Sequence, residues 1–320
     1  MQKAPFLTKL TNEFLSKLKD QGKTVNTIKN YKTDLDCYKG YLESHQQDDQ
    51  LRRTDLQHVL DYGKYLQTKY SSDNSRRRRV QTLRLFYDFL LINGYISENS
   101  VRKIPASPKF VDVPKPTDFG ETLSWWRYLS EEVAHSTDGL PKLIAQRNQL
   151  LFCLIFFGGL KVSQLSELQL DDLITEDDHS RVMVTHKKRD PYTVALPIYL
   201  NKIISDYKVS LTRGKVTSGI NFPEALFNAN PHRILSGGLS PRGIEIIFED
   251  IRGKIDAEAT PKKLREAAIC RWINLSTPTQ TIKEWMGVAP SYSLNRFTNI
   301  SDNFFYSEDA YEQTHLASIQ

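Results

Sequence analysis

The chain has 320 residues, of which 39% are apolar and 25% are charged, and its net charge is +5. This length predicts roughly two domains, and no run of about 18 apolar residues occurs, which argues against a membrane-spanning helix. The N-terminal segment is amphipathic and charged, unlike the apolar core of a secretory signal. Three scattered cysteines without metal-ligand spacing indicate reduced thiols, so we predict a cytoplasmic protein with no metal and no cofactor.

The positive charge is concentrated in the first third of the chain. Residues 1–110 hold 20 lysines and arginines against 12 acidic residues, whereas the last twenty residues hold four acidic and no basic ones. A basic domain predicts a polyanionic partner, with nucleic acid as the first candidate. The four consecutive arginines at 76–79 favour phosphate contacts over a merely solvated helix start, and Arg76, Arg77 and Arg79 are the candidates.

Apolar residues recur at helical spacing in four segments of residues 5–110. Ile28, Tyr31, Leu35, Tyr38 and Leu42 form one such stripe. The last segment reaches a glycine at position 94, where a left-handed cap costs little. Four helices in about a hundred residues predict a compact bundle.

A proline-rich stretch separates this bundle from the rest of the chain. Proline removes backbone donors and restricts the residue before it, so residues 104–117 are predicted to be a linker. The remaining boundaries follow: a helical domain at 1–103, a second domain at 118–300 and a tail at 301–320. Within the second domain, short β-branched pieces around residues 181–197 predict a strand, a turn and a strand, and helices are expected elsewhere.

Five segments, in order, resemble the tyrosine recombinases or phage integrases, particularly the Xer type. "TVNTIKNYKTDLDCYKGYL" and "RRRRVQTLRLFYDFL" resemble the first and last parts of their core-binding domain. "RNQLLFCLIFFGGLKVSQLSELQLDDL" is similar to the segment with G-L-R-x-x-E-L, and "TPKKLREAAICRWI" to P-H-x-L-R-H. "IKEWMGVAPSYSLNRF" is similar to L-G-H followed nine residues later by the nucleophilic tyrosine. The resemblance spans nearly the whole chain.

The fold that this resemblance implies is mainly α. It combines an N-terminal four-helix core-binding (SAM-like) domain with a mostly helical domain of the integrase catalytic type, which carries a small β-hairpin or sheet. Duplex DNA is the implied partner, without a membrane, and nucleoid association would follow in a bacterium.

Several positions of the family's catalytic site differ in this chain. The arginine that binds the scissile phosphate falls on Lys161, and the acid three residues later falls on Gln164. The histidine of P-H-x-L-R falls on Lys262, whereas its arginine is kept as Arg265. A pairing with Glu167 is the structural alternative for Lys161.

The remaining differences concern proton transfer and the nucleophile. The hairpin lysine, a general acid in active members, would be Lys187 or Lys188. The histidine of L-G-H becomes Val288 and the tyrosine becomes Phe297. A phenyl ring has no oxygen with which to form a phosphotyrosyl intermediate. Val288 cannot donate a hydrogen bond to a phosphate.

What remains at these positions is positive charge. Lysine at 161 and 262 and arginine at 265 stay cationic near neutral pH, although lysine lacks the bidentate fork of arginine. We therefore predict a pseudoenzyme: a catalytically inactive homologue that binds duplex DNA as a structural or regulatory protein. The predicted phosphate-binding residues are Lys161, Lys187, Lys188, Lys262, Arg265, Arg76, Arg77 and Arg79.

Other interpretations stay open at the sequence level. The main alternative is an active site-specific recombinase or integrase with atypical residues, in which Tyr292 or Tyr306 substitutes for the nucleophile. A protein-interaction module that no longer binds DNA is the third. Whether an active recombinase is a partner stays open. The resemblance implies a homo-oligomer on DNA in which the tail passes to a neighbouring subunit. Phe304, Phe305 and Tyr311 would anchor that tail, and folding back onto its own domain is the alternative.

Overall fold

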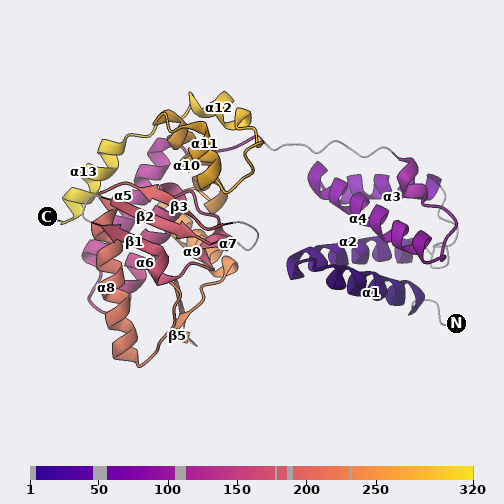
Figure 1. The fold of residues 1–320 in the computed structure, drawn as a ribbon, viewed down its shortest axis with the longest axis horizontal. Helices are drawn as coiled ribbons and strands as arrows, with labels where there is room; N and C mark the ends of the chain where they lie inside the picture. Colours follow the sequence, from indigo (N-terminus) through magenta and orange to yellow (C-terminus); the bar gives the residue numbers. More distant parts are fainter. Residues whose placement is uncertain are drawn as a thin grey trace. The chain divides into compact units, whose positions relative to one another are not determined.

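The chain divides into two compact units, Met1–Asp112 and Val113–Gln320 (Figure 1). The computed structural model describes residues 5–45, 56–104, 113–176, 179–185, 190–230 and 233–319. The division falls inside the predicted linker, of which residues 105–112 lie outside the described part. Among the described residues, no helix is long and apolar enough to span a membrane.

The first unit is a bundle of helices, as the sequence predicts. It contains α1 (Pro5–Asp20), α2 (Val25–Ser44), α3 (Leu56–Lys69), α4 (Asp73–Ile92) and a 3-10 helix (Ser100–Lys103). Thr24 and Ser72 cap α2 and α4, because each hydroxyl oxygen accepts the backbone N–H three residues later. The apolar faces share one core that includes Leu10, Phe14, Leu35, Tyr38, Tyr62, Leu83 and Phe86.

The second unit packs helices around two small antiparallel sheets. Its helices are α5 (Phe119–His135), α6 (Leu140–Phe156), α7 (Val162–Leu165), α8 (Leu200–Ser218), α9 (Pro241–Ile255), α10 (Pro261–Asn274), α11 (Thr279–Trp285), α12 (Asn295–Ser301) and α13 (Glu308–Ile319). Residues 150–157, in and just after α6, are fully buried, so this apolar segment forms the centre of the unit.

The larger sheet contains the predicted hairpin. Strands β1 (Leu173–Glu176), β2 (His179–Val184) and β3 (Tyr192–Leu196) pair in that order, all antiparallel. Val182 and Val194 are paired and buried, which fixes the register of β2 on β3. A second pair, β4 (Phe227–Asn230) and β5 (Arg233–Gly237), is a feature that the sequence pattern did not predict.

The turn after α6 leads directly to one of the candidate site residues. Gly159 adopts φ +60°, and a Cβ atom there would overlap the indole ring of Trp272 on α10. Only glycine meets both requirements without displacing its surroundings. The backbone carbonyl of Gly159 is therefore held at a fixed position against α10.

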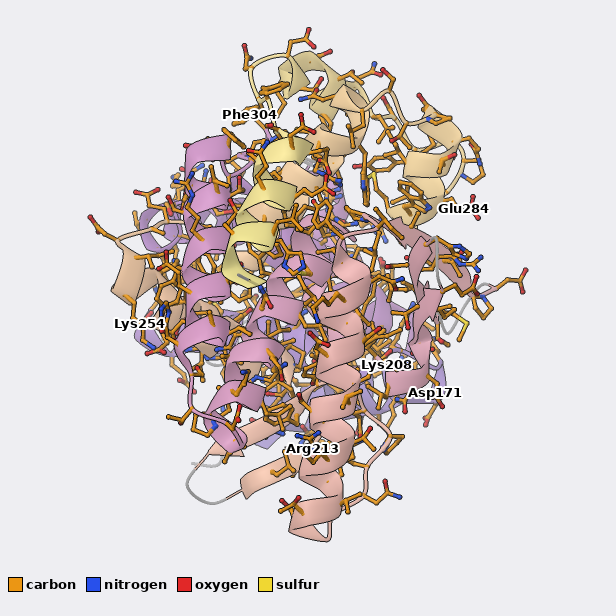
Figure 2. All side chains as sticks on the ribbon, turned by 90° about the vertical axis from the view of Figure 1, so that its left-hand side faces the viewer. Asp171, Lys208, Arg213, Lys254, Glu284 and Phe304 are labelled. Atoms are coloured by element: carbon orange, nitrogen blue, oxygen red, sulfur yellow. The ribbon has the colours of Figure 1, made fainter. Side chains whose placement is uncertain are left out.

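The tail lies on its own unit in this structure. Figure 2 shows α13, in yellow, running along α5. Tyr311 is fully buried, its hydroxyl lies 2.7 Å from the Thr122 hydroxyl, and the Trp126 indole N–H donates to its backbone carbonyl. Glu308 accepts two hydrogen bonds from Arg271, at 2.5 and 2.6 Å. Of the predicted anchors, Tyr311 thus packs on its own unit, whereas Phe305 is 72% exposed.

Candidate nucleic-acid interface

Arg265 joins the segments that carry the other candidate residues of the second unit. Its Nε donates to the Gly159 carbonyl at 2.7 Å, and its Nη2 donates to the Met286 carbonyl at 3.2 Å. The first carbonyl lies two residues before Lys161, and the second lies two residues before Val288. Burial lowers the pKa of the Arg265 guanidinium, with smaller contributions from nearby charges. Arg265 therefore links α10 to the segments that follow α6 and α11.

Lys161 stands at the start of α7, and its side chain is exposed. Its backbone N–H donates to the Gln164 side-chain oxygen at 2.8 Å, and the Gln164 amide donates to the Tyr192 hydroxyl at 2.9 Å. Gln164, at the position where the family's acid was expected, thus closes the first turn of α7 and connects it to β3. The glutamine contributes no negative charge beside Lys161.

Lys262 lies one helical turn before Arg265 on α10. Its side chain is 70% exposed, and its Nζ is 3.9 Å from Glu266 Oε1. Glu266 itself is buried and accepts the backbone N–H of Lys115 at 2.7 Å. An exposed pair at this distance contributes little to stability. The hairpin lysines Lys187 and Lys188 lie outside the described residues.

Val288 and Phe297 present apolar side chains at the positions that the resemblance assigns to a histidine and the nucleophile. Val288 is half-buried against the core, and Phe297, on α12, is 1% exposed. The guanidinium of Arg296 lies 4.7 Å from the centre of the Phe297 ring and 5.9 Å from the centre of the Tyr292 ring. Sequence reasoning missed Arg296, because an isolated arginine beside an expected nucleophile carries no motif signal.

The two tyrosines considered as substitute nucleophiles occupy different environments. Tyr306 is buried, its hydroxyl donates to the Thr117 carbonyl at 2.6 Å, and burial raises the pKa of its phenol. Those conditions oppose formation of a phenolate. Tyr292 is half-buried beside Arg296.

The arginine run of α4 is divided between the surface and the interior. Arg79 is 7% exposed, lies 3.6 Å from the centre of the Tyr70 ring and has its Nε 3.9 Å from the buried Asp34 carboxylate. Arg79 therefore serves the packing of the bundle, which a run of identical letters could not reveal. Arg76 is half-buried and donates to the Tyr70 and Ser71 carbonyls at 2.7 and 3.3 Å. Phosphate binding by Arg76 and Arg77 stays a prediction.

Arg79→Ala is expected to destabilise the first unit by about 2 kcal/mol, because it removes a cation beside the buried Asp34 carboxylate and the ring contact with Tyr70. Urea denaturation followed by circular dichroism measures the change. Lys64→Ala is the matched control, because its pair with Asp61 is exposed and such pairs contribute about 0–1 kcal/mol. Equal stability of the two variants would contradict the packing role.

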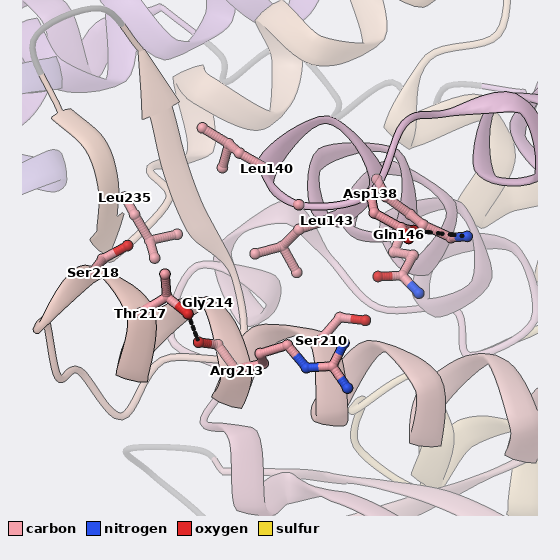
Figure 3. Close-up of a pocket in the computed structure, with 12 residues that line it drawn as sticks. Asp138, Leu140, Leu143, Gln146, Ser210, Arg213, Gly214, Thr217, Ser218 and Leu235 are labelled. Atoms are coloured by element: carbon pink, nitrogen blue, oxygen red, sulfur yellow. Dashed lines mark hydrogen bonds and ion pairs between the residues drawn. The ribbon is translucent and has the colours of Figure 1, made fainter.

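A cavity of about 320 Å³ lies elsewhere in the second unit (Figure 3). It is lined by the connection before α6, by the first two turns of α6, by the C-terminal half of α8 and by Leu235 of β5. None of the candidate residues of the interface lines this cavity.

Comparison with known proteins bears on the fold and on the site. The family model "Phage integrase, N-terminal SAM-like domain" matches residues 11–94. The tyrosine recombinase XerC of Anoxybacillus flavithermus is 23% identical over 278 residues, which cover 86% of this chain and 87% of the relative. The tyrosine recombinase XerD of Listeria innocua is 22% identical over 310 residues, covering 92% and 94%.

Two solved structures share the fold. A lambda integrase (75–356) dimer bound to a COC′ core site has a TM-score of 0.62 at 16% identity, covering 88% of this chain and 94% of that one. The XerH site-specific recombinase bound to palindromic difH substrate has a TM-score of 0.68 at 13% identity, covering 88% and 79%. The predicted fold, a SAM-like helical domain followed by a mostly helical domain with a small sheet, is confirmed.

Proposed function

We propose, because the chain belongs to the tyrosine recombinase family, that it binds duplex DNA and holds a backbone phosphate without cleaving the strand. Its role would be that of a structural or regulatory protein, with an active recombinase as its partner. The observation that carries the proposal is that Arg265 ties the segment of Lys161 to α10, while a buried phenylalanine occupies the position of the nucleophile.

Phosphate affinity is supported by the donors that these segments offer. Arg265 uses its Nε and one Nη2 hydrogen on backbone carbonyls, and its Nη1 makes no hydrogen bond within the described part of the chain. The exposed side chains of Lys161 and Lys262 add two ammonium groups on adjoining segments. Charged donors of this kind form short, strong hydrogen bonds with phosphate oxygens.

The absence of cleavage is inferred from the groups that the chemistry requires. Attack on a phosphodiester needs an oxygen nucleophile, and Phe297 supplies none. A general acid or base must exchange a proton near neutral pH. The valine at 288 has no titratable group, and a lysine, such as that at 262, is a poor base near neutral pH. Tyr306 is enclosed and hydrogen-bonded, which argues against it as a replacement.

The test combines a gel shift with a covalent-adduct assay. The protein is incubated with random-sequence duplex DNA, and separately with nicked suicide substrates, which retain a covalent protein–DNA product if strand attack occurs. We expect a shifted complex and no adduct that survives denaturing electrophoresis. A stable adduct from the unmodified protein would instead establish an active recombinase, and mass spectrometry of the adduct would show whether Tyr292 carries the DNA. The lack of any shifted complex would favour a protein-interaction module.

The affinity for DNA should fall steeply as the salt concentration rises, because each phosphate that the protein neutralises releases counterions. In a plot of log K against log salt concentration, each such phosphate contributes a slope of about −0.9. We expect the double variant Arg76→Ala and Arg77→Ala to reduce both affinity and slope more than Lys161→Ala does, since the basic surplus lies in residues 1–110. Fluorescence anisotropy at several salt concentrations measures both quantities. The opposite order would place the main DNA contact on the second unit.

A further inference from the structure

The cavity shown in Figure 3 is lined by one buried side chain whose polar atoms have no partner among the described residues. Gln146, in the second turn of α6, is 7% exposed, and its Oε1 atom is buried without a hydrogen bond. Its amide nitrogen makes no hydrogen bond with a described residue either. A buried acceptor that stays unpaired costs free energy, and most such groups in folded proteins have a partner. A molecule in the cavity could supply the missing donor.

Two further kinds of side chain line this cavity. Figure 3 shows Ser210 and Arg213 of α8 on the same side as Gln146. Arg213 is exposed, and its guanidinium makes no hydrogen bond or ion pair with a described residue. Apolar side chains also face the cavity, and they are Leu140, Leu143 and Leu235. A mostly apolar lining with a few polar groups is typical of small-molecule sites.

A glycine within α8 keeps this cavity open. A Cβ atom at Gly214 would lie 3.0 Å from Leu143 Cδ2 and 3.8 Å from Leu235 Cδ2. A side chain there would therefore press on two leucines of the lining. Glycine inside a helix lowers the stability of that helix relative to alanine, so Gly214 preserves space at a cost. The volume that results, about 320 Å³, lies at the lower end of the range for small-molecule sites.

The charges around the cavity favour an anionic occupant. Lys142 and Asp138 form an ion pair with each other at 3.5 Å, and the Asp138 side chain is 94% exposed. Among the described lining residues, Arg213 is therefore the cation without a carboxylate. A guanidinium binds a carboxylate through two parallel hydrogen bonds. An occupant that satisfies both polar groups has an N–H donor for Gln146 and a carboxylate for Arg213, on a body that is otherwise apolar.

We propose that this cavity binds a small apolar carboxylic acid with an amide N–H beside its carboxylate, which is the chemistry of an N-acylated apolar amino acid. Gln146 Oε1 accepts the amide N–H, and Arg213 binds the carboxylate. The apolar side chain of the ligand lies against Leu143 and Leu235. None of the described candidate residues of the nucleic-acid interface lines this cavity, so the inference does not depend on DNA binding.

A titration of the full chain with N-acetyl-L-leucine, followed by saturation-transfer-difference NMR, tests the proposal. We expect saturable binding with a Kd of about 0.1–1 mM, which suits a ligand of this size. N-acetyl-L-leucinamide keeps the N–H and the side chain but lacks the carboxylate, so it should bind about tenfold more weakly. If N-acetyl-L-leucine shows no saturable binding up to about 10 mM, the proposal is overturned, and ordered water is then the partner of Gln146.

Variants of the lining residues locate the bound ligand. Gln146→Leu and Arg213→Gln should each raise the Kd for N-acetyl-L-leucine about tenfold or more. Lys202→Gln is the control that removes the same charge from α8. Lys202 is exposed, pairs with Asp206 at 3.0 Å and does not line the cavity, so this variant should bind like wild type. Equal Kd values for all three variants would place the ligand elsewhere and overturn the proposal.

Thermal unfolding separates a ligand-binding role of Gln146 from a structural one. We expect Gln146→Leu to unfold at or above the wild-type temperature, because the substitution replaces an unpaired buried amide with an apolar side chain. A lower unfolding temperature with an unchanged Kd would assign Gln146 to the packing of α6 and overturn the proposal. If Gln146→Leu does not fold, the exposed Arg213 decides: a wild-type Kd for Arg213→Gln then contradicts the site.

Discussion

Deletion of α13 (residues 308–320) is expected to lower the free energy of unfolding of the second unit by at least about 3–5 kcal/mol. The deletion removes Glu308 and leaves the guanidinium of Arg271, whose side chain is 5% exposed, without its carboxylate. It also removes the buried Tyr311 ring and uncovers Trp126. Chemical denaturation followed by tryptophan fluorescence measures the loss.

Point variants separate the ion pair from the rest of the helix. Glu308→Ala should account for a large part of the loss, whereas Glu312→Ala, an exposed residue of the same helix, should change stability by less than about 0.5 kcal/mol. Light scattering of full-length and truncated protein, with and without DNA, reports the assembly state. A truncated protein of unchanged stability but altered assembly would mean that the tail acts on a neighbouring subunit in solution.

Phe297→Tyr alone is expected to produce no detectable phosphotyrosyl adduct. The substitution returns one oxygen, but an unassisted phenol has a pKa near 10 and is rarely ionised at neutral pH. Charge that develops on the phosphate would meet lysine at 161 and 262 and valine at 288. Each missing preorganised contact lowers the rate on the order of a hundredfold or more, and the lost proton transfer contributes roughly another 10²–10⁴-fold.

The combined variant that adds Lys161→Arg, Lys262→His and Val288→His to Phe297→Tyr tests, on a nicked suicide substrate, whether these groups together account for the missing adduct. Denaturing electrophoresis with labelled DNA detects the product, and a gel shift of each variant shows that binding persists. An adduct from Phe297→Tyr alone would show that the remaining cations suffice for catalysis. In that case lysine at 161 and 262 would have to be counted as catalytic residues.

The first unit could be predicted from local patterns, because its helices follow apolar spacing and end at recognisable residues. The predicted end near Gly94 agrees with α4, which ends at Ile92. The pair β4–β5 was missed, because its strands are four and five residues long and carry little β-branched sequence. The helix α13 was not foreseen either, since its stability derives from contacts with α5 and α10 that are distant in the sequence.

At the candidate site, too, the sequence could identify residues but not the surroundings that the fold gives them. The family resemblance pointed to Lys161, Arg265 and Phe297, and Arg265 connects the segments of Lys161 and Val288. Spacing could not show that Arg79 points into the bundle toward Asp34 and Tyr70, because burial depends on which face of α4 meets α2. Nor could it show that Arg296 has a buried Nε without a hydrogen-bond partner and lies over the Phe297 ring.

Gly159 takes part both in the packing of the core and in the placement of the candidate site residues. Its left-handed backbone and its close approach to Trp272 leave no room for another side chain, while its carbonyl receives Arg265. Any residue that replaced it would shift the turn before Lys161 and the orientation of Arg265 together. The packing of Gly159 against Trp272 therefore holds in place both the turn before Lys161 and the carbonyl that receives Arg265, whether or not the site cleaves a strand.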